Sequence, residues 1–143
     1  MLIDQGGLGT AGLKTGSFTQ HPTFVNLGHV LAWSHHPTLG GHFPLGAGDQ
    51  VRLDLRDGPP GGATCLVVGL TQLLSPFKGG VLVPSPDVLL GPLPIGADGT
   101  LSLQDAWPTD LLHGTKLYLQ HWMTDSSSPT GYAASNALEA TTP

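Results

Sequence analysis

The 143-residue sequence predicts an all-β protein, an antiparallel two-sheet β-sandwich of about seven to nine strands, immunoglobulin-like or jelly-roll-like. Two observations lead to this fold class. Glycine and proline interrupt the chain 21 and 13 times, too often for long helices. Between these breaks, short segments alternate apolar and polar residues with the period of two that is typical of strands. The hydrophobic fraction of 39% suits one core in a chain of this length, so we expect a single domain.

The first predicted strand covers residues 29–35, where successive side chains point to opposite faces and Pro37 ends the pattern. The next covers residues 51–56, whose alternation is strict. Val51, Leu53 and Leu55 are directed inward there. This second strand therefore has one buried face and one wet face.

Two apolar segments follow in the middle of the chain. Residues 64–71 are apolar on both faces, which predicts a central strand covered on each side, and residues 80–83 form another short core strand. Residues 86–95 contain three prolines and cannot form a continuous ladder. Asp98-Gly99 is the dipeptide typical of a two-residue hairpin loop, after which Leu101 starts a new period of two.

The last third of the chain predicts the closing strands. Residues 107–114 carry the break, polar cap and terminal glycine of one short helical turn near 108–113. Residues 115–125 form the longest predicted strand, with Leu119 on one face and Trp122 on the other. Residues 134–141 return as the final strand, so we expect the C-terminus to be tied into a sheet.

Composition narrows the classes of function. The net charge is −5 and basic residues form no cluster, which argues against a nucleic-acid partner. No apolar run is long enough for membrane insertion, and nothing indicates a cofactor. Cys65 is the single cysteine, so it forms no internal disulfide and is expected to pack as a small apolar side chain. Only 10% of residues are charged, which leaves little repulsion between copies and favours self-association.

The chain divides into a glycine-rich N-terminal arm, residues 1–16, and one sandwich domain, residues 17–143. Met1–Asp4 lack the features of a secretory signal peptide. The composition nevertheless favours an exported protein, present as a mature chain or a fragment, located outside the cell or at its surface.

Several motifs along the chain resemble a β-sandwich domain found at the C-terminal end of large secreted bacterial proteins. The N-terminal motifs are Gly9-Thr10-Ala11-Gly12, Pro44-Leu45-Gly46 before residues 51–55, and Pro59-Pro60-Gly61-Gly62 before residues 66–69. The closing motifs are Asp98-Gly99, Trp107-Pro108, Gly114–Gln120 with Trp122 and Asp125, and Ser135-Asn136-Ala137-Leu138. The resemblance implies an extracytoplasmic appended module that has no family active site.

A structural subunit that assembles with itself, in a filament, tube or surface layer, is the function that the sequence favours most. Low charge, β-edges and the glycine-rich arm support it, because an extended arm can add a strand to the open edge of a neighbour. The arm residues that we expect to take part in assembly are Gly6, Gly7, Leu8, Gly9 and Thr10.

A carbohydrate-binding or adhesion module is the alternative. Flat aromatic rings beside polar groups stack on sugar faces. The candidate polysaccharide-binding residues are Tyr118, Gln120 and Trp122. This function requires an exposed pair of rings.

A metal site is the further alternative, because neutral imidazoles bind zinc, copper or nickel. His29, His35 and His42 are the candidate ligands. Adjacent His35 and His36 point to opposite faces of an extended strand, and no acidic or cysteine ligand lies in the same segment, so we expect no metal.

Catalysis is not expected. The aspartates are spread among turns without the pattern of a calcium loop, and no pairing of carboxylates for hydrolysis is visible. Ser126, Ser127 and Ser128 lack a nucleophile elbow and a base. A hydrolase of unknown type is the only enzymatic alternative left open.

Overall fold

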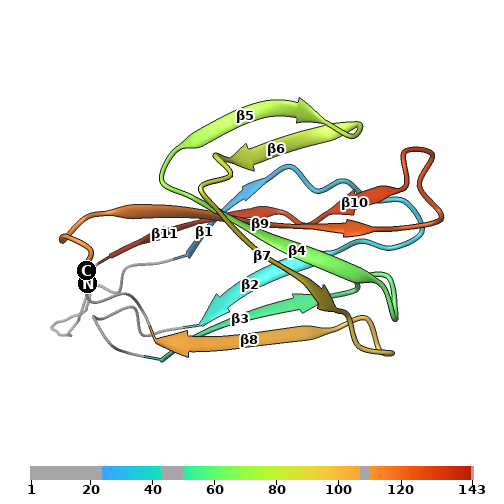
Figure 1. Ribbon diagram of the computed structural model, residues 1–143, viewed down its shortest axis with the longest axis horizontal. Helices are drawn as coiled ribbons and strands as arrows, with labels where there is room; N and C mark the ends of the chain where they lie inside the picture. Colours follow the sequence, from blue (N-terminus) through green and yellow to red (C-terminus); the bar gives the residue numbers. More distant parts are fainter. Residues whose placement is uncertain (1–23, 43–49, 107–109, 143) are drawn as a thin grey trace, which may run out of the picture.

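A computed structural model describes residues 24–42, 50–106 and 110–142 of the chain. These residues form antiparallel strands and no helix, which confirms the predicted all-β sandwich (Figure 1). The strands are β1 (Phe24–Gly28), β2 (Thr38–His42), β3 (Gln50–Arg56), β4 (Ala63–Gly69), β5 (Gln72–Phe77), β6 (Gly80–Pro84), β7 (Val88–Pro94), β8 (Leu101–Ala106), β9 (Lys116–Thr124), β10 (Tyr132–Ala134) and β11 (Ala137–Thr141).

The strands stack in three layers (Figure 1). The middle layer, sheet A, has the order β1-β11-β9-β4-β7, and β10 also pairs with β9. Sheet B, with the order β2-β3-β8, covers one face of sheet A. The β5–β6 hairpin covers part of the other face, at the top of Figure 1.

The central strand β9 contributes side chains to the apolar core on each face of sheet A. Leu119 and Met123 point towards sheet B and join the apolar clusters between sheets A and B. Trp122 points the other way and packs beneath the hairpin, where the Phe77 ring meets it edge-on at 5.1 Å between centroids. Both faces of β9 are therefore covered, as its sequence pattern predicted.

Four predicted strands are confirmed, namely 51–56, 64–71, 80–83 and 115–125. The inward direction of Val51, Leu53 and Leu55 is confirmed as well. The proline-rich segment 86–95 contains β7, and its ladder with β4 shifts register between Leu90 and Leu93, so the predicted interruption is present.

The predicted strand at residues 29–35 is wrong. The Asn26 side chain accepts the Gly28 N–H at 2.8 Å, and Gly28 and His29 both have positive φ, so the chain turns where the strand was expected to begin. Beyond this turn, pairing is limited to a single bridge between Leu31 and Ala134. The alternation of side chains was real, but the segment has no partner strand along its length, whereas β1 pairs with β11.

The closing segments differ from the prediction in three details. Asp98-Gly99 forms a tight turn, with Gly99 at φ 80°, but it joins β7 in sheet A to β8 in sheet B and is not a hairpin within one sheet. The described part of the predicted helical turn, from Asp110, contains turns and no helix, and Trp107-Pro108 lie outside the described residues. The final strand is two strands, because Ser135-Asn136 interrupts it.

Asn136 fastens sheet B to sheet A. Its side-chain oxygen accepts the Leu39 N–H at 2.7 Å, and its side-chain nitrogen donates to the Leu39 carbonyl at 3.0 Å. The neighbouring Ser135 hydroxyl accepts the backbone N–H of His121 at 2.9 Å. Both polar residues are buried, so the interruption of the last strand satisfies backbone groups from β2 and β9.

We expect Asn136→Ala to lower the free energy of unfolding by about 3 kcal/mol, because it leaves the buried N–H and C=O of Leu39 without partners. Urea denaturation at neutral pH measures this. Asn26→Ala is the matched control, since Asn26 is exposed and makes one local bond, and it should cost less than about 1 kcal/mol. Equal losses in the two variants would contradict the role of Asn136.

Candidate functional site

The proposed sugar-binding residues are buried. Gln120 is fully buried, and Tyr118 and Trp122 are 9% and 6% exposed. The Gln120 side-chain oxygen accepts the N–H of Val83 at 3.0 Å and the indole N–H of Trp122 at 2.9 Å, and its nitrogen donates to the Val81 carbonyl at 3.2 Å. Gln120 thus holds the β5–β6 hairpin on sheet A, and the three side chains offer no exposed stacking platform.

Asp125 anchors a corner of the molecule. Its carboxylate accepts the backbone N–H and the hydroxyl of Ser127 at 2.9 and 2.7 Å, and its second oxygen lies 3.6 Å from Nδ1 of His35. Burial acts to raise the pKa of Asp125, but the bonds from Ser127 and the neighbouring His35 outweigh it and hold that pKa below its usual value. Asp125 therefore joins the loop after β9 to the loop before β2.

The three candidate metal ligands lie apart. His29 is at the turn after β1, His35 faces Asp125, and His42 binds Asp54 at 2.7 Å. Within residues 24–42, 50–106 and 110–142, no three histidine, cysteine or acidic side chains gather closely enough to hold a metal ion.

Two contacts resemble fragments of a catalytic site. On the outer face of sheet B, Asp54 accepts bonds from Ser102 and His42, so the serine hydroxyl is bonded to the carboxylate and not to the imidazole. Partial burial acts to raise the pKa of Asp54, but these two bonds and the charge of Arg52 hold it below its usual value. In the core, the Thr64 hydroxyl lies 2.8 Å from Nδ1 of His121, but both side chains are buried away from any substrate.

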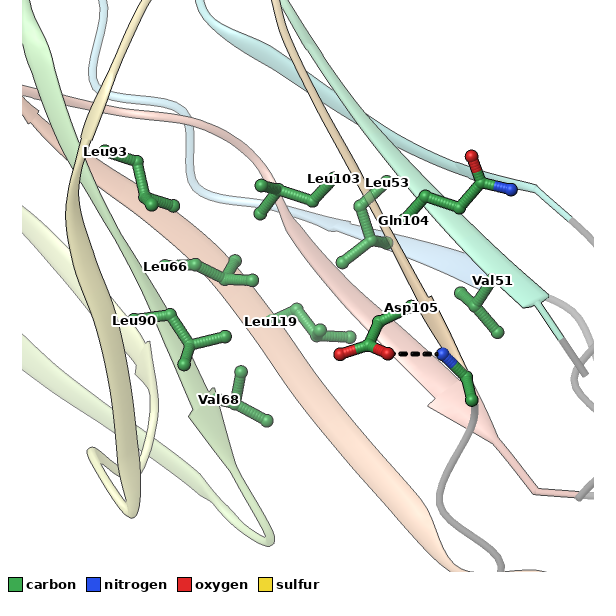
Figure 2. Close-up of a pocket in the computed structure, with 11 residues that line it drawn as sticks. Val51, Leu53, Leu66, Val68, Leu90, Leu93, Leu103, Gln104, Asp105 and Leu119 are labelled. Carbon is green, nitrogen blue, oxygen red and sulfur yellow. Dashed lines mark hydrogen bonds between the residues drawn. The ribbon is translucent and has the colours of Figure 1, made fainter. Parts of the chain in front are cut away.

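The open side of the sandwich is the candidate interaction surface. Among the described residues, β7 at the edge of sheet A and β8 at the edge of sheet B each have a neighbouring strand on one side only. Between them lies an apolar groove of about 370 Å³. Figure 2 shows Leu90 and Leu93 on one side of this groove and Leu103 on the other, with Leu66 and Leu119 behind them.

Further exposed apolar side chains lie in the segment from the end of β4 to β7, and Leu90 is the one among them that lines the groove. Seven of the ten large hydrophobic side chains that are well exposed in the described residues lie between positions 70 and 90. They are Leu70, Leu73, Leu74, Phe77, Val88, Leu89 and Leu90. The base of the hairpin and the start of β7 adjoin, because the Leu70 N–H donates to Asp87 at 2.8 Å.

Sequence reasoning missed this surface, because Val88, Leu90 and Leu103 follow the pattern of core residues. The available signal was the proline-rich segment before Ile95, which predicted an interrupted strand and hence an edge. The predicted assembly residues Gly6 to Thr10 lie outside the described residues. Their role stays a prediction.

Comparison with known proteins adds one structure. No family model matches the sequence, and no curated protein matches it. A solved structure that matches is the soluble domain of PmoD from Methylocystis sp., at 11% identity and a TM-score of 0.45, over 82% of this chain and 98% of that chain. In the described part of the chain, no helix is both long and apolar enough to cross a membrane.

His121 is a buried titratable group in the core between the sheets. Thr64 donates its hydroxyl to the Trp122 carbonyl at 3.2 Å, so Nδ1 of His121 is assigned as the donor to Thr64. Nε2 of His121 is buried without a hydrogen-bond partner. Burial lowers the pKa of His121 to about 4, because it removes the solvation that stabilises a charged imidazolium.

The depressed pKa makes stability depend on pH. The unfolded chain takes up a proton at His121 below about pH 6.5 and the folded chain only near pH 4, so acid favours unfolding between these values. We expect the free energy of unfolding to fall by about 2 kcal/mol from pH 7.5 to pH 5.

Denaturant titration across this range measures the slope. His121→Leu should remove most of it, whereas His113→Leu, which changes an exposed histidine, should keep it. An unchanged slope in His121→Leu would contradict the assignment.

Proposed function

We propose that this chain is a noncatalytic structural module that associates with copies of itself through the open side of its sandwich. The observation that carries the proposal is the apolar groove between β7 and β8, which are edge strands of their sheets among the described residues. Exposed backbone groups beside an apolar surface favour the addition of another strand.

Exposed apolar side chains at the open side support association. Val88 and Leu90, on the sheet-B side of β7, are 48% and 45% exposed, and exposed apolar surface marks interaction sites. The low charge of the chain leaves little repulsion between copies. Both features suit an extracellular filament, tube or surface layer of the kind expected from the sequence.

The residues of the closing pattern support a structural role. Gln120, Ser135 and Asn136 are buried and each binds backbone of another element, and buried Asp125 binds Ser127 in its own loop and faces His35 in the loop before β2. A module that resembles an appended sandwich domain therefore uses its most distinctive polar residues for architecture. A carbohydrate-binding role has no comparable support, because the candidate aromatic rings are covered.

Sedimentation of the purified 143-residue protein tests the proposal. The average mass should rise above the 14.8 kDa of one chain as concentration increases. Leu90→Lys places a charge at the apolar groove and should keep the protein monomeric, with an unchanged circular dichroism spectrum. Leu112→Lys is the matched control, since Leu112 is 80% exposed and does not line the groove. A wild-type monomer at all concentrations would refute self-association.

A further inference from the structure

The two sheets of the sandwich differ in width, and the groove lies where they differ. Sheet A is five strands wide, whereas sheet B has three. β2, at one edge of sheet B, contacts β1 and β11 at the corresponding edge of sheet A. The position where sheet B lacks a strand opposite sheet A is therefore at the other edge, beside β8 and beneath β7. This explains why Val88 and Leu90, which point towards the sheet-B side of β7, are 48% and 45% exposed.

The groove has the features of a position for one more strand in sheet B. β8 pairs with β3 through six residues without a register shift, and it contains no proline, so the edge that has no neighbour among the described strands can form a regular ladder. A strand added there would lie beneath Leu90 and Leu93. Its inward side chains would fill the groove of about 370 Å³.

The edge of a second folded copy does not fit this position. In every copy, Leu103 of β8 packs against the cluster that contains Leu66 of β4, so β8 is covered by its own sheet A. If β8 of a second copy paired with β8 of the first, the sheet A above it would collide with the overhanging β7. The groove therefore admits a single strand that carries no sheet of its own.

We propose that the occupant is the N-terminal arm of a neighbouring copy, with Gly6 to Thr10 added to sheet B beside β8; this inference rests on the proposed function. If Leu8 points into the groove, the period of two places Thr10 on the same face and Gly7 and Gly9 on the outer face of sheet B. The arm thus presents side chains to the apolar groove alone. Glycine at the outer positions lets the strand lie there without further packing.

The place where the arm joins the domain supports exchange between copies. The described chain begins at Phe24 in β1, at the edge of sheet A opposite to β7. Residues 11–23 span at most about 45 Å when extended. To fill the groove of its own copy, the arm would have to pass around the sandwich. Residues 11–23 would then be ordered along that path, which costs conformational entropy without burying apolar surface. A neighbour that places its β1 edge at the open side avoids this detour, and repetition of that contact generates an open chain of copies.

Disulfide capture in the full-length protein tests the donor and the acceptor. Both partners carry Cys65→Ala to remove the native thiol. One partner adds Leu8→Cys and a tag, and the other adds Leu103→Cys. Because opposed residues on adjacent strands meet the distance required for a disulfide, mild oxidation of the mixture should give a tagged–untagged dimer. Ser102→Cys is the matched control, since its side chain bonds Asp54 on the outer face, and it should cross-link at least about tenfold less.

The outcomes separate this inference from the proposed function. A third variant carries both Leu8→Cys and Leu103→Cys in one chain. Cross-linking within this chain, with none between the two single-cysteine partners, would show that the arm fills its own groove and would overturn the exchange between copies. Sedimentation that shows association without either cross-link would overturn the arm as donor while leaving self-association intact.

Sedimentation of a Leu8→Asp variant, with no other change, tests the arm independently, because Leu8 lies outside the described sandwich. It should prevent association as Leu90→Lys does, and association at the wild-type level would refute the inference.

Discussion

The fold depends on two buried amide side chains that hold its three layers together. Asn136 bonds both backbone groups of Leu39 in sheet B, and Gln120 bonds Val81 and Val83 of the hairpin above sheet A. A buried amide without partners costs several kcal/mol in an apolar interior, so each layer is held where these partners are met. Apolar packing makes the layers adhere, and the amides fix which strands face each other. The open side follows from this fixed alignment, because sheet B cannot slide beneath β7.

The alternation of residues predicted the strands that have continuous partners, and it failed where tertiary contacts decide the conformation. β2 contains two adjacent glycines, which sequence rules associate with turns. Gly41 lies in a strand because the Phe24 ring packs so closely that a Cβ atom would stand 2.5 Å from it. In β5, Leu74 adopts φ 53° at a bulge, and Leu74 and its neighbour Leu73 are both exposed, which departs from a period of two. Neither the contact of Phe24 with Gly41 nor the bulge at Leu74 can be derived from local propensity.

The candidate site could be predicted only in part, and for a different reason. Aromatic and amide side chains suit sugar binding and buried anchoring equally well, so the identities of Gln120 and Trp122 could not distinguish the two. Their strand face was predicted correctly, but the cover over that face comes from the β5–β6 hairpin. Similarly, Leu90 and Leu103 have the pattern of core residues. Leu90 is exposed and Leu103 only partly buried because sheets A and B receive unequal numbers of strands, which the sequence of any one strand does not encode.

In the described part of the chain, the edges at β7 and β8 differ in a way that limits what can bind them. β7 ends in Gly91-Pro92-Leu93-Pro94, and its two prolines lack the N–H groups that an extended ladder requires. β8 contains no proline, so each of its residues has an N–H group, but the overhang of β7 blocks the approach of another covered sheet. Asp105 lines the groove, and Figure 2 shows its carboxylate bonded to the Ala106 N–H, at 2.7 Å. This charged side chain disfavours the pairing of β8 with an entirely apolar strand edge of another molecule. One edge is thus blunted by its sequence and the other by its position, so the groove selects a lone strand over indiscriminate edge-to-edge aggregation.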